Sequence, residues 1–131
     1  MSAEFLDSNV VLYLLSGDDP KRAIAKKLLS NDAVVSVQVL NETASVAKRK
    51  YRIDWDQLNG FIEDLLPILR VEPLTLHDHN SAREIAERYG LAFYDALIVA
   101  SALGAECTTL YTEDMQHGQK IGDLTIVNPF R

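Results

Sequence analysis

Four acidic residues, spread over the chain, have the type and placement needed to bind a divalent cation. Asp7 ends the first predicted strand, and Asp114 follows the fourth predicted strand by a few residues. Glu42 lies on a predicted helix, and Asp95 lies near the start of a very apolar one. Because ligands gather at the carboxyl ends of the strands in an open parallel sheet, we expect these four side chains to meet in one pocket.

A cluster of four carboxylates requires a neutralising partner. Two carboxylates about 5 Å apart repel each other by roughly 3 kcal/mol at an effective dielectric constant near 20. No Lys or Arg occurs between Arg88 and Lys120, so no cation is local to Asp95. Oxygen ligands without His or Cys suit Mg²⁺ or Mn²⁺ better than Zn²⁺. One or two such ions would activate water for attack on a phosphodiester, which leaves a 3′ hydroxyl and a 5′ phosphate.

Each acid also has a purely structural interpretation. Asp7, Asp95 and Asp114 lie near predicted helix starts, where Asp commonly caps the backbone or complements the helix dipole. Glu42 shares a helical face with Val46, where an unpaired carboxylate is costly. The sequence therefore leaves capping open for the three aspartates. Glu42 is harder to explain in this way, and Asp95 is harder still, because its predicted helix is apolar on nearly all sides.

The composition predicts one globular domain over residues 1–131. The chain weighs 14.6 kDa, with 47% hydrophobic and 24% charged residues, which is within the range of globular proteins. The single cysteine, Cys107, excludes a disulfide framework and a cysteine-based zinc site. The formal net charge of −6 argues against nucleic-acid binding through a generally basic surface. Metal ions in the acidic pocket would instead supply the positive charge at a scissile phosphate.

Targeting signals are not predicted. No run reaches the roughly 18 apolar residues that a membrane span requires. The apolar segment 10–15 follows Glu4 and Asp7, where a signal peptide would carry positive charge. We therefore expect the protein in a reducing cytoplasm.

Short apolar segments that alternate with helical patterns must position the acids. Strands are expected at 4–7, 33–35, 68–71 and 107–111, with a possible fifth at 124–127. A short helix over 10–15 is expected first, then helices that begin at caps Asp19, Ser36, Asp54, and Thr75 or Asp78, then an apolar helix over 92–105. The helix capped by Ser36 should run to about Lys50, the helix capped by Asp54 should stop at Pro67, and the helix that begins at Thr75 or Asp78 should stop at Gly90. A turn is expected at Asn31–Asp32. This alternation predicts an α/β fold, a three-layer α/β/α sandwich with a central, mainly parallel sheet of four to five strands.

Four segments resemble the PIN-domain family, and most closely the VapC toxins of toxin–antitoxin pairs. They are Phe5–Leu12, Asn41–Glu42, Tyr94–Ala100 and Leu110–Gly118, in register over essentially the whole chain. The resemblance implies a PIN-like fold and a Mg²⁺- or Mn²⁺-dependent endoribonuclease that cleaves single-stranded RNA.

Individual positions can be compared with the family pattern. Asp7, Glu42, Asp95 and Asp114 match the acidic metal-site positions; Asn9 and Thr112 match polar positions that orient ligands or water. His117 stands where relatives often have Asp, so a further acidic ligand on that turn is open, with Glu113 as an alternative.

The family resemblance also implies partners. It predicts a homodimer, inhibited by a small VapB-like antitoxin whose C-terminal segment lies across the active-site groove. In such complexes a basic antitoxin side chain often reaches the acid cluster. The sequence pI of about 4.9 fits a basic partner electrostatically.

The densest basic run, Lys48 to Arg52, has two interpretations. It is a solvated helix end favoured by the helix dipole, or it binds RNA phosphates, with Arg49 as the best candidate and Lys48 beside it. Trp55 and Phe61 have the type to stack bases, but a place in the core or in a dimer interface suits both better.

Two other functions remain open. A catalytically silent PIN-like module would keep the fold and use its acids to hold a basic protein partner. A phosphatase would use Asp7 as nucleophile, but that chemistry usually needs a second acid where Asn9 stands. His77 and His79 are two apart at a helix start, so they point in different directions and suit capping better than shared metal binding.

Overall fold

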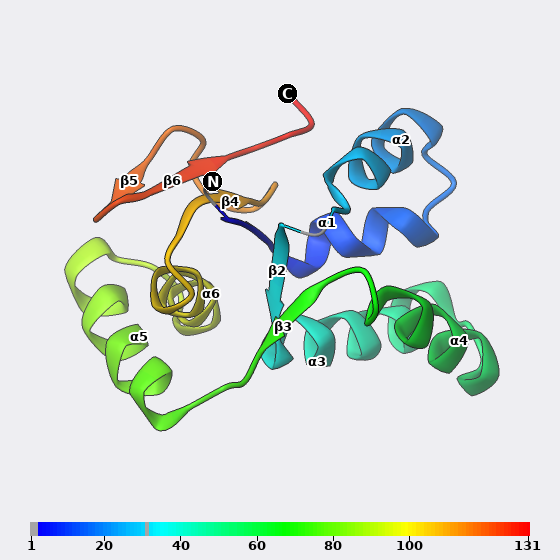
Figure 1. Ribbon diagram of the computed structural model, residues 1–131, viewed down its shortest axis with the longest axis horizontal. Helices are drawn as coiled ribbons and strands as arrows, with labels where there is room; N and C mark the ends of the chain where they lie inside the picture. The colour runs from blue at the N-terminus through cyan, green and yellow to red at the C-terminus, as the bar shows by residue number, and fades with distance from the viewer. Residues whose placement is uncertain (1–2, 31) are drawn as a thin grey trace.

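The protein is a three-layer α/β/α sandwich around a six-stranded sheet (Figure 1). The computed structural model describes residues 3–30 and 32–131. The predicted turn at Asn31–Asp32 includes Asn31, which lies outside the described residues. The strands are β1 (Ala3–Leu6), β2 (Ala33–Ser36), β3 (Arg70–Glu72), β4 (Cys107–Tyr111), β5 (Lys120–Ile121) and β6 (Leu124–Val127). The helices are α1 (Ser8–Leu12), η1 (Tyr13–Leu15), α2 (Asp19–Leu28), α3 (Val37–Val46), η2 (Ala47–Tyr51), α4 (Trp55–Leu65), α5 (Leu76–Tyr89) and α6 (Phe93–Gly104).

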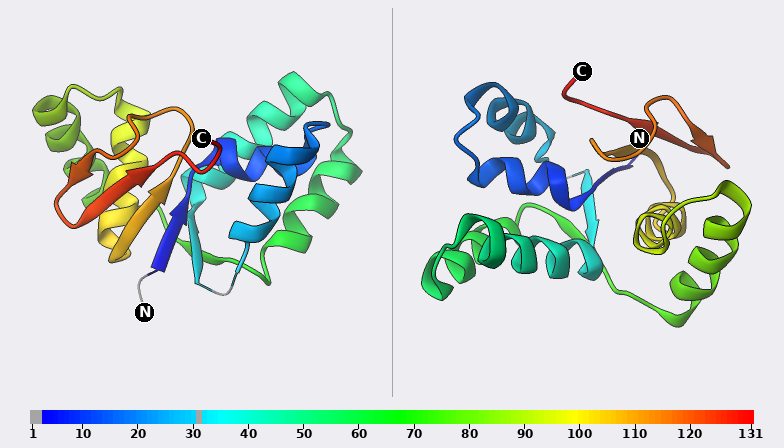
Figure 2. Two further views of the ribbon diagram at one scale, coloured as in Figure 1. Left: turned by 90° about the horizontal axis from the view of Figure 1, so that it is seen from above. Right: turned by 180° about the vertical axis from the view of Figure 1, so that it is seen from behind.

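The strand order is β3-β2-β1-β4-β6-β5, and each pairing is parallel except that of β5 with β6. Successive parallel strands require crossover helices, which cover both faces of the sheet. Figure 2 shows α5 and α6 on one side of the sheet and α1 to α4 on the other. The prediction of a mainly parallel sheet within three layers is therefore confirmed.

Each central strand contributes fully buried apolar residues because both faces of the sheet are covered. Phe5 and Leu6 of β1, Val34 of β2, Leu110 of β4 and Ile126 of β6 have at most 1% of their surface exposed. Burial is continuous along β2, as is typical of parallel strands, whereas buried and partly exposed residues alternate along β6.

Helix starts follow the predicted capping chemistry closely. The side chains of Ser36, Asp54 and Thr75 accept hydrogen bonds from the backbone of the first turns of α3, α4 and α5. Gly90 ends α5 in the left-handed conformation with φ of 69°. One cap is shifted: Asp18, and not Asp19, caps α2.

Three predicted boundaries were wrong. The sheet has six strands, not four to five, because β5 has two residues and leaves no periodic signal. The third strand begins at Arg70, after a turn, and not at Ile68. The helix expected to run to about Lys50 is α-helical only to Val46 and continues as the π-helical turn η2, which ends at Arg52 with a left-handed φ of 55°.

The direction in which successive strands are added to the sheet reverses at β1. The chain moves from β1 to β2 and β3 on one side, and β4 pairs with β1 on the other. Such a switch point places the carboxyl ends of β1 and β4 side by side, at the edge where open parallel sheets bind their ligands.

Candidate active site

Asp7 immediately follows β1 and is almost fully buried, with 4% of its surface exposed. Its Oδ1 accepts the backbone N–H of Ser8 over 2.7 Å, so Asp7 caps α1 as one interpretation of the sequence predicted. Its Oδ2 accepts the hydroxyl of Thr112 over 2.9 Å. Burial raises the pKa of Asp7 to about 6, against these hydrogen bonds, with Asp95 and Asp114 raising it further.

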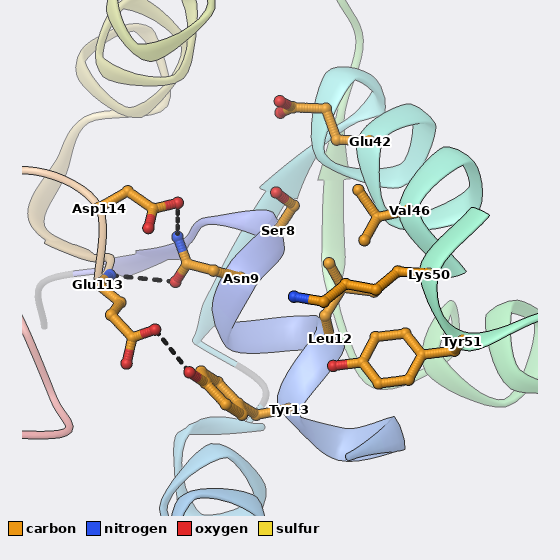
Figure 3. A pocket seen from close by; sticks show the side chains of 10 residues that line it. All are labelled: Ser8, Asn9, Leu12, Tyr13, Glu42, Val46, Lys50, Tyr51, Glu113 and Asp114. Atoms are coloured by element: carbon orange, nitrogen blue, oxygen red, sulfur yellow. Dashed lines mark hydrogen bonds between the residues drawn. The ribbon is translucent and has the colours of Figure 1, made fainter. Parts of the chain in front are cut away.

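Asn9 and Thr112 connect Asp7 to Asp114. Asn9 Nδ2 lies 3.0 Å from Thr112 Oγ1 and 3.1 Å from Asp114 Oδ2, and 3.4 Å from Asp7 Oδ2. Thr112 Oγ1 in turn accepts the backbone N–H of Asp114 over 3.2 Å. Asn9 Oδ1 accepts the backbone N–H of Glu113 over 3.1 Å (Figure 3). The polar side chains after β1 and β4 thus form one network around two of the four acids.

Asp114 lies in a bend after β4 and not near a helix start, so the capping interpretation was wrong for this residue. The chain after Tyr111 enters the short strand β5 without forming a helix. The carboxylate of Asp114 is therefore free of any helix-capping role in the described structure.

Glu42 lies on α3 and faces the same pocket. Its Oε1 is buried and has no hydrogen-bond partner among residues 3–30 and 32–131. Burial, followed by the charges of Asp7, Asp95 and Asp114, raises the pKa of Glu42 to about 7. A buried carboxylate oxygen without a partner is costly, so a cation bound beside Glu42 would stabilise the folded protein.

Asp95 lies in the first turn of α6, whose following residues from Ala96 to Ala102 are all buried. Its side chain forms no capping hydrogen bond, but its place in the first turn fits the predicted interaction with the helix dipole. Burial and the charge of Asp114 raise the pKa of Asp95. After burial, the charges of Asp95 and Asp114 also raise the pKa values of Asp7 and Glu42, so the four acids predicted from the sequence lie near one another.

The described residues do not form a finished metal centre. No three His, Cys, Asp or Glu side chains in the ranges 3–30 and 32–131 are arranged to share one ion. The donor set nevertheless fits a hard divalent cation, because the acids offer only oxygen atoms and Glu42 Oε1 lacks any other partner. No lysine or arginine pairs with any of these four carboxylates in the described part of the chain.

Glu113 and His117 point to other partners. Glu113 accepts hydrogen bonds from Lys21 Nζ over 2.7 Å and from the Tyr13 hydroxyl over 2.5 Å, and these bonds hold its pKa below the usual value. His117 Nδ1 accepts the backbone N–H of Asn128 over 2.9 Å. Glu113 therefore lines the cleft beside the acids while bound to Lys21 and Tyr13, whereas His117 is not among the residues that line it.

Lys48 and Arg49, the two basic residues predicted to bind RNA, make different contacts. Lys48 Nζ donates to the carbonyl of Ile53 over 2.8 Å and lies 4.8 Å from the centre of the Trp55 ring. Arg49 lines a groove next to Glu42. Trp55 is 62% exposed, so of its two predicted places the core was wrong and the dimer interface stays a prediction.

Lys50 was expected near the site only as a member of the basic run from Lys48 to Arg52, and Tyr51 was not expected there. Lys50 and Tyr51 line an open cleft of about 360 Å³ that also includes Asn9, Glu42 and Asp114 (Figure 3). The signal for Lys50 was present: Glu42, Val46 and Lys50 recur at four-residue spacing along one helical face. Only the π-helical turn brings Tyr51 into the same cleft.

The PIN-domain family model matches residues 5–120. The chain belongs to the PIN-domain family. This assignment confirms the resemblance read from the four segments, and the family match spans all four acids. No curated protein sequence matches the chain significantly.

Solved structures share the fold at low sequence identity. A toxin–antitoxin complex from Klebsiella pneumoniae superimposes with a TM-score of 0.74 at 20% identity, covering 98% of both chains. VapBC-1 from nontypeable Haemophilus influenzae gives a TM-score of 0.72 at 21% identity, covering 98% of this chain and 99% of that chain. VapC20 from Mycobacterium tuberculosis, a sarcin–ricin loop cleaving toxin, gives a TM-score of 0.68 at 22% identity, covering 86% of this chain and 92% of that chain. This PIN domain therefore has the fold of VapC toxins.

The helices of the described residues contain no segment with the length and hydropathy of a membrane span.

Proposed function

We propose that this PIN domain is a metal-dependent endoribonuclease, the toxin of a VapBC-type toxin–antitoxin pair. The observation that carries the proposal is the buried, unpartnered Oε1 of Glu42, whose pKa is raised to about 7 by burial and then by three nearby carboxylates. Such an arrangement is costly in the apo protein and is relieved by a bound cation. The family and the VapC-like fold support the same conclusion.

Asp7, Glu42, Asp95 and Asp114 would hold one or two Mg²⁺ or Mn²⁺ ions. Such ions activate water and stabilise the negative charge that develops on a phosphate during phosphodiester cleavage. Asp7 is fixed by the Ser8 backbone and by Thr112, so its carboxylate is already oriented without the ion. Asp114 depends on Asn9 for its orientation.

Asn9 and Thr112 act as positioning residues. Asn9 reaches oxygens of Asp7, Thr112 and Asp114 with one amide nitrogen, which keeps the carboxylates after β1 and β4 at a constant separation. Partners of this kind typically contribute a factor of about 10–100 to metal affinity or activity.

We further propose a homodimer, in the cytoplasm, that binds a small antitoxin with a basic side chain directed to the acids. The formal net charge of −6 and the unneutralised carboxylates support a basic partner. Related folds are solved as toxin–antitoxin complexes, such as the one from K. pneumoniae.

The decisive experiment sequences RNA ends after brief expression of the protein and of the Asp7→Asn variant. New 5′-phosphate ends are expected with the natural chain and not with the variant. Purified protein should cleave single-stranded RNA only when Mg²⁺ or Mn²⁺ is present. Cleavage of equal rate by purified Asp7→Asn would overturn the mechanism.

A silent binding module is the second candidate. The observation in its favour is that no three acids in residues 3–30 and 32–131 are arranged around one ion. Metal titration separates the two functions, because a nuclease site gains stability from Mn²⁺ and a silent acidic surface need not.

A further inference from the structure

The cleft beside the acids carries side chains of both charges. α1 and the loop after β4 contribute Asn9 and Asp114, and the helix α3–η2 contributes Glu42 and Lys50. In Figure 3 the Lys50 amine and the Tyr51 hydroxyl both point from η2 into the cleft, toward α1. Lys50 and Tyr51 therefore bring two hydrogen-bond donors to a cleft that is also lined by the carboxylates of Glu42, Glu113 and Asp114.

The π-helical turn is what brings both donors to this cleft. Lys50 lies four residues after Val46 and eight after Glu42, so it continues their face of the helix. A π turn has more residues per turn than an α-helix, which brings consecutive side chains closer to one face and lets Tyr51 join Lys50. Single π turns are rare and recur at functional sites. Arg52 then ends the turn in the left-handed region, with φ of 55°.

Lys50 differs from the neighbouring lysines in having no partner. Lys21 is paired with Glu113, and Lys48 donates to the carbonyl of Ile53. Within the described ranges 3–30 and 32–131, neither Lys50 Nζ nor the Tyr51 hydroxyl forms a hydrogen bond, and Lys50 forms no ion pair with Glu42 or any other acid. The positive charge of Lys50 is thus not used to neutralise the acid cluster.

We propose that Lys50 and Tyr51 bind a backbone phosphate of single-stranded RNA, next to the phosphate that is cleaved. This inference rests on the proposed nuclease function and identifies how the substrate is held. An ammonium group and a phenolic O–H are both donors, and a phosphate oxygen accepts from both. The cleft otherwise presents Glu42, Glu113 and Asp114 to a polyanion, so the Lys50 ammonium offsets part of their repulsion.

The test measures binding of a short, fluorescently labelled single-stranded RNA by anisotropy, over a series of salt concentrations. All proteins carry Asp7→Asn, so that the RNA stays intact in the presence of Mn²⁺. Lys50→Met is expected to weaken binding about tenfold, as one charged phosphate contact is lost. The plot of log K against log salt concentration has a negative slope. Lys50→Met is also expected to make this slope less steep by about 0.7, the value for one phosphate contact on a single strand.

Two further variants make the result specific. Tyr51→Phe keeps the ring and removes only the hydroxyl, so it should weaken binding about threefold without changing the salt slope. Lys26→Met, on the exposed end of α2, removes the same charge away from the cleft and should bind like the parent. Circular dichroism and Tm confirm that each variant is folded.

The outcomes separate the subsite from the proposed function. If the natural chain cleaves RNA but Lys50→Met binds RNA like Lys26→Met, the subsite is wrong and the nuclease function stands. If Lys50→Met lowers the affinity and makes the slope less steep but the natural chain never cleaves RNA, the subsite stands and the nuclease function fails. If an oligoglutamate peptide competes with RNA as well as unlabelled RNA does, the cleft binds acidic protein segments and the RNA subsite is overturned.

Discussion

The side-chain amide of Asn9 donates a hydrogen bond to Asp114 Oδ2 over 3.1 Å, although the two residues are 105 positions apart. Asn9 lies in the first turn of α1, directly after β1, and Asp114 lies in the bend after β4. The bond is possible because β1 and β4 are neighbours in the sheet, with Leu6 opposite Tyr111. Asn9 also accepts the backbone N–H of Glu113, so it holds both the side chain and the backbone of this loop.

Replacing Asn9 with Ala should reduce RNA cleavage about 10- to 100-fold, the usual effect of losing a group that orients a ligand. The backbone N–H of Glu113 loses its acceptor and Asp114 loses its donor, so the loop becomes less ordered. Cleavage rates at saturating Mn²⁺ and the Mn²⁺ concentration at half-maximal rate measure the effect. Asn59→Ala, an exposed change on α4, is the control, and equal rates for both variants would contradict the role of Asn9.

Replacing Asp7 with Asn should abolish cleavage while the metal-free protein remains folded. The amide keeps the shape of the carboxylate and can still accept the Ser8 N–H, but it removes a buried negative charge. Steady-state cleavage and thermal unfolding without metal report on the two effects separately. Asp123→Asn, in the exposed turn between β5 and β6, should leave both unchanged. An unfolded Asp7→Asn protein would show that Asp7 is primarily structural.

The stability of the metal-free protein should fall as the pH rises from about 4 to about 7. Burial raises the pKa of Asp7 from 3.8 to about 6, and that of Glu42 from 4.5 to about 7. The folded state therefore keeps protons that the unfolded chain has already released, so the stability present below the unfolded pKa values is lost as the pH passes the folded ones. For Asp7 the loss amounts to roughly 3 kcal/mol.

Urea unfolding at a series of pH values, with a chelator present, measures this dependence. The Asp7→Asn variant should show a flatter profile than the natural chain, since one of the two groups no longer titrates. A stability that rises over the same pH window would contradict the proposed burial of these carboxylates.

Mn²⁺ should raise the Tm of the protein, and more at pH 7.5 than at pH 5.5. A ligand that binds only the folded state stabilises it by about 2.7 kcal/mol at one hundred times its Kd. Protons compete with the ion for Asp7 and Glu42, which explains the pH dependence. Glu42→Gln should remove most of the shift, and Glu63→Gln, exposed on α4, should not. An equal Mn²⁺ shift in Glu42→Gln would exclude Glu42 as a ligand.

Replacing Lys21 with Met should lower RNA cleavage with little loss of stability. Lys21 and Tyr13 hold the Glu113 side chain away from the acids, while Asp114, the next residue, faces them. Without Lys21, the Glu113 side chain is free to move toward the four acids, where it would compete with Asp114 for the metal ion. Arg22→Met breaks an ion pair on the same helix with Asp19 and should leave cleavage unchanged. Tm measurements and cleavage rates together distinguish this effect from unfolding.

Much of this fold could be predicted from local patterns. The caps at Ser36, Asp54 and Thr75, and the left-handed Gly90, depend on side chains and backbone groups within a few residues, so the sequence carries their signal directly. The apolar run before β4 likewise predicted a buried α6. The same local reasoning failed for β5, whose two residues are set by pairing with β6.

The sequence by itself determined the residue types of the site: four acids, an amide and a hydroxyl that follow strands or begin helices. Which of these share a pocket was decided by the order of β1 and β4 in the sheet, because hydrogen bonds between strands act across more than a hundred residues. The tertiary structure also decided that Glu113 turns to Lys21, and that Lys50 and Tyr51 face the cleft. These choices depend on charge and burial in three dimensions, which spacing along the chain indicates only for Lys50, through its four-residue repeat with Glu42 and Val46.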